Sequence, residues 1–135
     1  MYFIFKVMNG TDAYRLEALL ELAAEYPASL TVAEVARRRE IPAKFLARLL
    51  GELAREDLVS ATRGPRGGVR LAVAPDALAV SRLLPPDPPP DAGGPAVRWL
   101  AQRLANAHER ALAPVRLAGL LEVERARAEA SDFAI

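Results

Sequence analysis

Three arginines and three glycines crowd into one short stretch of the chain, residues 63–71, where their chemistry suits a polyanion. The stretch carries Arg63, Gly64, Pro65, Arg66, Gly67, Gly68 and Arg70. Guanidinium groups bind phosphate oxygens through paired hydrogen bonds, and glycine permits the backbone conformations of a tight hairpin. The apolar runs at residues 59–62 and 69–73 predict the two strands of that hairpin. On these residues alone, a solvated hairpin without a ligand remains an equal alternative.

Three helices are predicted to position this hairpin. Their ranges are residues 13–26, 32–39 and 43–56. Leucines and alanines recur at helical spacing in the first, and Pro27 ends it. Thr31 and Glu34 have the spacing of a capping box, which opens the second helix. Ile41 and Pro42 then make a tight connection to the third.

The order helix, short helix, tight turn, helix and hairpin predicts a winged helix-turn-helix domain, mainly α with a small β-hairpin wing. This domain is expected at residues 9–84. On its third helix, Lys44 and Arg48 lie four residues apart and therefore share one face, which would enter a major groove. Ala43 and Ala47 lie close to that face and are small enough to permit close approach. A three-helix bundle with a solvated basic face is the alternative.

Charge is concentrated on the same part of the chain. The whole chain has a net charge of only +1, but residues 37–70 contain nine basic and four acidic residues. A local basic face is typical of a protein that binds double-stranded DNA. Besides the hairpin residues, the expected DNA contacts are Arg37, Arg38, Ala43, Lys44, Phe45, Ala47 and Arg48. The run Arg37, Arg38 and Arg39 can place at most two side chains on one face.

A proline-rich linker, residues 85–95, follows a short helix predicted at residues 75–84. Six of the 11 prolines lie at residues 85–95, so this segment is expected to be extended. A helical region at residues 96–130 comes next, with a long helix to about residue 113 and a last helix that fades after residue 121. The long helix repeats apolar residues at heptad spacing: Val97, Leu100, Leu104, Ala107 and Ala111. This seam predicts a homodimer; packing of the helix on its own domain is the alternative.

Several function classes are excluded by what the chain lacks. It has no cysteine and one histidine, so disulfides, thiol catalysis and cysteine-bound clusters are not available. No carboxylate pair, metal-ligand cluster or phosphate-binding glycine loop before a helix is recognisable, and we expect neither an enzyme nor a cofactor. No membrane-spanning segment or secretory signal is apparent, which favours a cytoplasmic protein. The first eight residues are interpreted as an added strand, a dimer contact or translation from an upstream start codon.

Two motifs together resemble the Rrf-type regulators, the bacterial winged-helix family that includes IscR, NsrR and CymR. One is the turn Ile41-Pro42 followed by Phe45-Leu46, and the other is the hairpin at residues 63–71. The resemblance runs from about residue 9 to about residue 122. It implies a homodimer that binds a pseudo-palindromic operator, with the third helix in the major groove and the wing in the minor groove. A repressor is the leading hypothesis, and a winged-helix scaffold that binds proteins instead of DNA is the alternative; no residue indicates an effector.

The chain also departs from the family's usual pattern. Many members bind an iron–sulfur cluster through cysteines in the loop before the long helix, and the corresponding loop here has prolines and no cysteine. The wing has Val69 where a tyrosine is common, and the third helix has Ala47 and Arg48 where Glu-Gln is common. Loss of a carboxylate and gain of an arginine predict stronger dependence on phosphate contacts and looser sequence choice.

Overall fold

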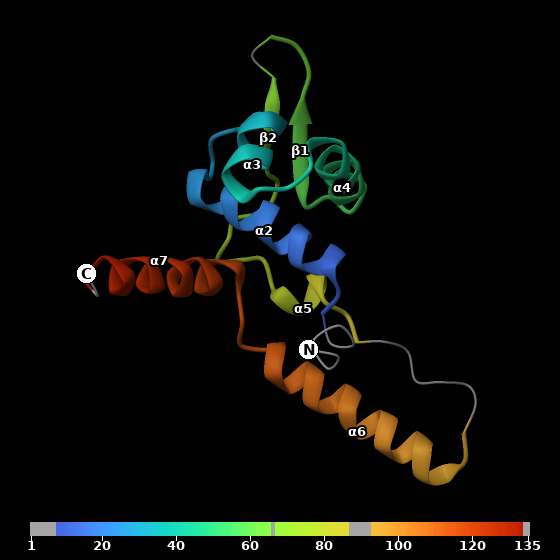
Figure 1. The fold of residues 1–135 in the computed structure, drawn as a ribbon. Helices are drawn as coiled ribbons and strands as arrows, with labels where there is room; N and C mark the ends of the chain where they lie inside the picture. Colours follow the sequence, from blue (N-terminus) through green and yellow to red (C-terminus); the bar gives the residue numbers. More distant parts are fainter. Residues whose placement is uncertain (1–7, 66, 87–92, 134–135) are drawn as a thin grey trace.

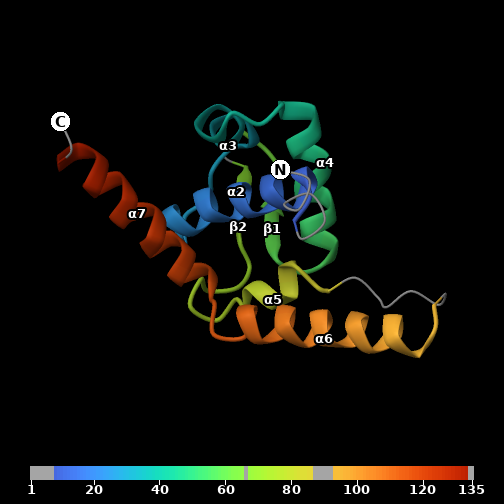
Figure 2. The ribbon, with the colours of Figure 1, turned by 60° about the horizontal axis from the view of Figure 1, so that its bottom comes forward.

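A computed structural model describes residues 8–65, 67–86 and 93–133 of the chain. Its helices and strands run in the order α2 (Gly10–Glu25), α3 (Val32–Arg39), α4 (Ala43–Arg55), β1 (Val59–Thr62), β2 (Gly68–Leu71), α5 (Val80–Leu83), α6 (Pro95–Leu112) and α7 (Leu117–Phe133). Helices α2, α3 and α4 and the hairpin form one body, while α6 and α7 extend from its base in different directions (Figures 1 and 2). The predicted winged helix-turn-helix arrangement is therefore present.

Helix α2 lies at the centre of this body and contacts α3, α4, α7 and β2. It begins three residues earlier than the apolar spacing suggested, because Asn9 caps it. The Asp12 backbone N–H donates to Asn9 Oδ1 at 2.8 Å, and the Asn9 N–H donates to the Asp12 carboxylate at 3.3 Å. Leu19 and Leu22 are fully buried on its inner face.

The helix-turn-helix follows from two local signals. The predicted capping box at the start of α3 is confirmed, with the Glu34 N–H donating to Thr31 Oγ1 at 3.1 Å and the Thr31 N–H donating to Glu34 at 3.0 Å. Glu40 ends α3 in the left-handed conformation (φ 54°). Ile41 is then buried, and this apolar contact directs the chain into α4.

The hairpin is joined to the helices by a third, single-residue strand. In the antiparallel pair of β1 and β2, Val59 faces Leu71 and Thr62 faces Gly68. On the other side of β2, Leu30 exchanges two backbone hydrogen bonds with Val69, at 2.8 and 2.7 Å. Leu30 lies in the connection between α2 and α3. Its hydrogen bonds with Val69 therefore hold the hairpin against the helical part of the domain.

Two predicted helix boundaries are wrong. The short helix expected at residues 75–84 is only α5, because the segment before it pairs with the connection between α6 and α7. There the Leu117 N–H donates to the Leu78 carbonyl at 2.9 Å, and the Val80 N–H donates to the Val115 carbonyl at 3.0 Å. The last helix does not fade after residue 121 but continues to Phe133. Its alanines, glutamates and arginines favour helix even where they are exposed.

The hydrophobic core extends beyond the range predicted for the winged helix. Leu117 and Leu121, from the first turns of α7, are buried in the same cluster as Leu19, Leu46 and Leu53. Helix α6, in contrast, has no buried residue. Helix α7 therefore belongs to the packing of the helix-turn-helix body, although it follows the linker in the sequence.

Candidate nucleic-acid interface

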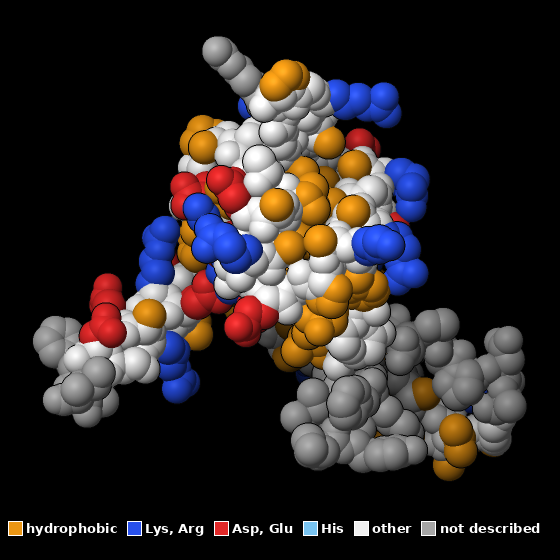
Figure 3. Space-filling view, turned by 45° about the horizontal axis from the view of Figure 1, so that its top comes forward, with side chains coloured by type: hydrophobic (Ala, Val, Ile, Leu, Met, Phe, Trp, Pro, Cys, Tyr) orange, Lys and Arg blue, Asp and Glu red, His pale blue; other side chains and the backbone are white. Residues whose placement is uncertain are grey.

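The exposed face of α4 carries a row of basic side chains, called here the α4 basic stripe: Lys44, Arg48 and Arg55. All three are exposed, and their spacing of four and seven residues brings them to one face of the helix. Figure 3 shows several basic side chains along the side of the molecule that carries α4, whereas most acidic side chains in this view lie on the other side together with further basic ones. The stripe thus presents positive charge on an exposed helix face.

Small residues keep this face open. Ala43 and Ala47 are exposed beside the stripe. Gly51 lies within it, and a methyl group placed there would have no atom within 4 Å. Pro42 caps α4 without a side-chain hydrogen bond, so within the described residues no side chain caps the first backbone N–H groups of the helix, which are of the kind that bind anions. A flat, basic and unobstructed helix face fits the width of a major groove.

Arg48 is held in place by an aromatic stack. Its guanidinium carbon lies 5.0 Å from the centroid of the Phe45 ring. Tyr14 of α2 in turn meets Phe45 edge to face, with the ring centroids 5.4 Å apart. Phe45 is only half-buried and packs against the core. Phe45 was predicted as a DNA contact, and its observed position is that of a platform for Arg48.

The tight turn of the hairpin depends on its glycines. Gly64 has a positive φ of 107°, and its carbonyl accepts a 2.8 Å hydrogen bond from the Gly67 N–H. A Cβ on Gly67 would lie 2.2 Å from the Thr62 carbonyl oxygen, and one on Gly68 would lie 2.8 Å from that of Leu30. These positions accept glycine only, because the clashing atoms are backbone.

The structure describes two of the three arginines of the hairpin, and both are exposed. Arg63 is exposed beside Gly64 and Pro65, and Arg70 is exposed opposite Ser60 in the ladder. Arg66, expected at the tip, lies outside the described residues. Arg63 and Arg70 therefore add exposed positive charge to the hairpin, which projects from the helical body (Figure 1).

The three consecutive arginines at the end of α3 do not act as one group. Arg37 is exposed. Arg38 lies 3.4 Å from Glu21 and 3.3 Å from Glu25, both on α2. Arg39 is mostly buried and binds carboxylates of α2 and α7. Only Arg37 of this run lacks a carboxylate partner among the described residues, so the run contributes less positive surface than its sequence suggests.

Two residues of this surface were missed in the list of expected contacts. Arg55 lies seven residues after Arg48, a spacing that places it on the same face and was available from the sequence. Tyr14 supports Phe45 from another helix, and nothing in the local sequence of α2 indicates that contact.

Helix α6 has two distinct stripes. Ala101, Ala105, His108 and Leu112 are half-buried, and His108 Nε2 lies 2.7 Å from the Leu84 carbonyl oxygen next to α5. The other, called here the α6 apolar stripe, is the predicted seam of Val97, Leu100, Leu104, Ala107 and Ala111. Its three large members are between 50% and 63% exposed. Contact with the helix's own domain thus uses a different stripe and leaves the seam uncovered.

Comparison with known proteins matches this architecture. The model of the Rrf2 family, described as iron-dependent transcriptional regulators, matches residues 8–86. A candidate HTH-type transcriptional regulator of Synechocystis is 43% identical over 74 residues, which cover 53% of this chain and 49% of that protein. The chain therefore spans about half the length of the curated relatives it matches.

The iron dependence in the family description does not fit the residues of this chain. Its 135 residues contain no cysteine and a single histidine. Within the described ranges, no group of three or more His, Asp or Glu side chains is arranged to hold a metal ion. His108 is engaged with a backbone carbonyl. An iron centre held by cysteines has no ligands in these 135 residues.

Solved structures extend the similarity to α6 and α7. The structure of CymR, the global cysteine regulator of B. subtilis, has a TM-score of 0.71 and 25% identity and covers 84% of this chain and 95% of that chain. IscR of T. potens has a TM-score of 0.72 at 22% identity, over 85% of each chain. In the described part of the chain, no helix is both long and apolar enough to cross a membrane. The family model covers more than half of the chain, and the protein belongs to the Rrf2 family of transcriptional regulators, which are not enzymes.

Proposed function

We propose that this protein is a homodimeric repressor that binds a pseudo-palindromic DNA operator through α4 and the hairpin. The observation that carries the proposal is the set of exposed basic side chains on α4 and the hairpin, namely the α4 basic stripe, Arg63 and Arg70. Both elements project from one core, so that a helix and a wing reach adjacent grooves of the same duplex.

Each element has a distinct role in this proposal. Lys44 and Arg48 face the bases and phosphates of the major groove, and the open surface around Ala47 and Gly51 permits close approach. Arg63, Arg66 and Arg70 serve the minor groove and its phosphates. The contacts to phosphate contribute most of the affinity and make it depend on salt.

The α6 apolar stripe supports the homodimer. Leu100 is 51% exposed and Leu104 is 63% exposed, which is unusual for large apolar side chains on a helix that already packs on its own domain. A second copy offers an identical stripe, and a two-fold axis pairs the two stripes with each other. Two DNA-binding faces then meet half-sites about 10 base pairs apart, or a multiple of that spacing. Repression by occlusion of a promoter is the simplest outcome of such binding.

The test begins with selection of fragments from the source genome on the purified protein. Binding of the best fragment is then measured over a salt titration. We expect submicromolar affinity and a steep linear fall of log Kobs with log salt, because several phosphates are neutralised. The double variant Arg48→Ala/Arg66→Ala is expected to weaken binding at an unchanged melting temperature.

A matched control removes the same charge elsewhere. Arg125 and Arg127 are exposed on the distal half of α7, and Arg125→Ala/Arg127→Ala removes two positive charges away from the proposed surface. If the operator fragment binds Arg48→Ala/Arg66→Ala as tightly as the wild type, the assignment of the surface is wrong. If no fragment is enriched and binding to duplex is salt-insensitive, the protein is a protein-interaction scaffold instead.

A further inference from the structure

We infer that Arg39 is a positioning residue for DNA binding, which fixes the end of α3 by tying it to the C-terminal helix α7. The inference rests on the proposed function but assigns a role to residues outside the DNA-binding surface. In the sequence Arg39 belongs to a basic run just before α4. In the structure its side chain binds carboxylates of α2 and α7 instead.

Arg39 binds three carboxylates from two helices. Its Nη1 and Nη2 donate to the two oxygens of Glu124 at 2.8 and 2.6 Å, which is a bidentate pair. The same Nη1 donates to Glu17 at 2.7 Å, and Nε donates to Glu21 at 3.1 Å. Only 13% of the Arg39 side chain is exposed. One guanidinium thus joins α3, α2 and α7.

The location of Arg39 in the chain gives this contact its consequence. Arg39 is the last residue of α3, and Glu40 follows in the left-handed conformation that starts the turn. Helix α4 begins only four residues after Arg39, at Ala43. A side chain that fixes the end of α3 therefore fixes the point from which the recognition helix departs.

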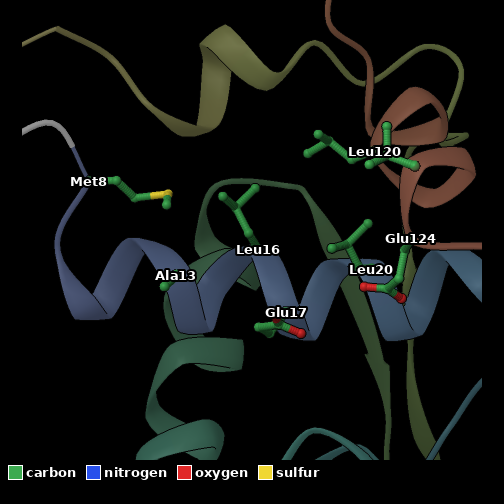
Figure 4. Close-up of a pocket in the computed structure, with 8 residues that line it drawn as sticks. Met8, Ala13, Leu16, Glu17, Leu20, Leu120 and Glu124 are labelled. Carbon is green, nitrogen blue, oxygen red and sulfur yellow. The ribbon is translucent and has the colours of Figure 1, made fainter. Parts of the chain in front are cut away.

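Helix α7 packs against α2 and the core through its first turns. Its first turns are anchored in the core by Leu117 and Leu121. Beside them an open groove of about 300 Å³ lies between α7 and α2, lined by apolar side chains that include Leu16, Leu20 and Leu120 (Figure 4). Glu17 and Glu124 stand on the two helices that border it (Figure 4). Residues 125–132 are exposed, so among the described side chains the ion pair of Arg39 with Glu124 is the outermost tie of α7 to the body.

Removal of one partner unbalances the charges of the cluster, although Glu21 keeps its contact with Arg38. Without Arg39, the carboxylates of Glu17, Glu21 and Glu124 repel one another across α2 and α7. Without the Glu124 carboxylate, Arg39 loses its bidentate partner and the end of α3 gains freedom. In both cases the loss acts on DNA binding through the orientation of α4, at a site that touches no phosphate.

The test uses Glu124→Gln and the operator fragment from the selection above. Removal of a negative charge from a DNA-binding protein would by simple electrostatics tighten binding. The positioning role predicts the opposite, a loss of affinity. We expect a loss of about five-fold or more, because coupling between distant sites typically begins at about that factor. Glu122→Gln is the matched control, because Glu122 is exposed on the same helix; its affinity should equal or slightly exceed that of the wild type.

A second comparison separates positioning from phosphate contact. Arg39→Ala should lower the affinity without changing the slope of log Kobs against log salt. Arg37→Ala, on the exposed side of the same helix, should reduce that slope by about 1, as loss of one phosphate contact does. Arg39→Met combined with Glu124→Leu replaces the ion pair by an apolar contact and should recover affinity relative to Arg39→Ala.

Three outcomes are decisive. Weaker binding by Glu124→Gln, an unchanged slope for Arg39→Ala and recovery in the apolar pair support the inference. The inference is overturned if Glu124→Gln binds the operator as tightly as Glu122→Gln does, or if Arg39→Ala reduces the slope of log Kobs against log salt. Either result leaves the proposed function standing. No salt-dependent binding by the wild type overturns both.

Discussion

The guanidinium carbon of Arg48 lies over the ring of Phe45, 5.0 Å from its centroid, on the exposed face of α4. A long arginine side chain normally samples many rotamers, and ordering it on DNA has an entropic cost. The Phe45 platform, supported by Tyr14, restricts Arg48 before any ligand arrives.

Replacement of Phe45 by leucine tests this relationship. Leucine keeps an apolar side chain against the core but removes the aromatic face, so DNA affinity should fall about two- to five-fold, which corresponds to a cation–π contribution of about 0.5–1 kcal/mol. Fluorescence anisotropy with a labelled operator duplex measures the change. In an Arg48→Ala background the same replacement should have no further effect; equal losses in both backgrounds would show that the two residues act independently.

Replacement of two glycines by alanine is expected to change the stability in opposite directions. Gly68→Ala places a methyl group 2.8 Å from the Leu30 carbonyl oxygen, and the strand pairing there must shift. We expect a loss of about 1–3 kcal/mol in the free energy of unfolding. Gly51→Ala meets no atom within 4 Å in the interior of α4 and should stabilise by about 0.5–1 kcal/mol. Thermal denaturation of the two variants gives both values, and an equal effect of the two changes would contradict the pairing of Leu30 with β2.

A pH dependence follows from the ion pair between α3 and α7. Hydrogen bonds from Arg39 lower the pKa of Glu124 below its ordinary value of 4.5. A carboxyl with a lowered pKa in the folded state stabilises the protein above the pKa of the unfolded state, and this contribution is lost as the pH falls through the folded value. The wild type should therefore exceed Glu124→Gln in stability near neutral pH.

Chemical denaturation over a pH series measures that difference. It should be constant above about pH 5 and should shrink as the carboxyl is protonated at lower pH. Glu122→Gln supplies the control, since Glu122 is exposed on the same helix. A difference that grows toward acid pH would contradict the assigned direction.

The α6 apolar stripe predicts the effect of one charge on assembly. Leu104→Glu places a carboxylate in the proposed seam and should convert the dimer to a monomer in sedimentation equilibrium at micromolar concentration. Gln102→Glu adds the same charge on the opposite side of α6, where Gln102 is exposed and hydrogen-bonds to Asn106 at 3.0 Å, and should leave the dimer intact. If Leu104→Glu sediments as a dimer, the partner contact lies elsewhere.

Local signals predicted much of the fold. The Thr31 and Glu34 pair, Pro27, and the Ile41-Pro42 turn each act within a few residues, and the helices they delimit are present within a few positions. The hairpin was predicted for the same reason, since its glycines and flanking apolar residues are adjacent in sequence. Signals of this range are independent of the rest of the chain.

Features that depend on distant partners were not predictable from the sequence. A single residue, Leu30, completes the sheet, and one residue has no periodicity to detect. The bidentate partner of Arg39, Glu124, is 85 residues away, so from the sequence the arginine was read as part of a basic run. Likewise the pairing of residues 78–80 with residues 115–117 shortens α5 by using backbone groups that a helix would need.

The backbone bonds between Leu30 and Val69 have a further consequence for how the protein meets its ligand. They hold the hairpin against the connection between α2 and α3 inside the free protein, so that its placement on the helical body is set before the proposed contact with DNA. Little conformational freedom then remains to be lost on association, and a rigid surface of this kind favours a slow off-rate over adaptability. Changes of target in related sequences are accordingly expected at exposed side chains rather than in the spacing between the two elements.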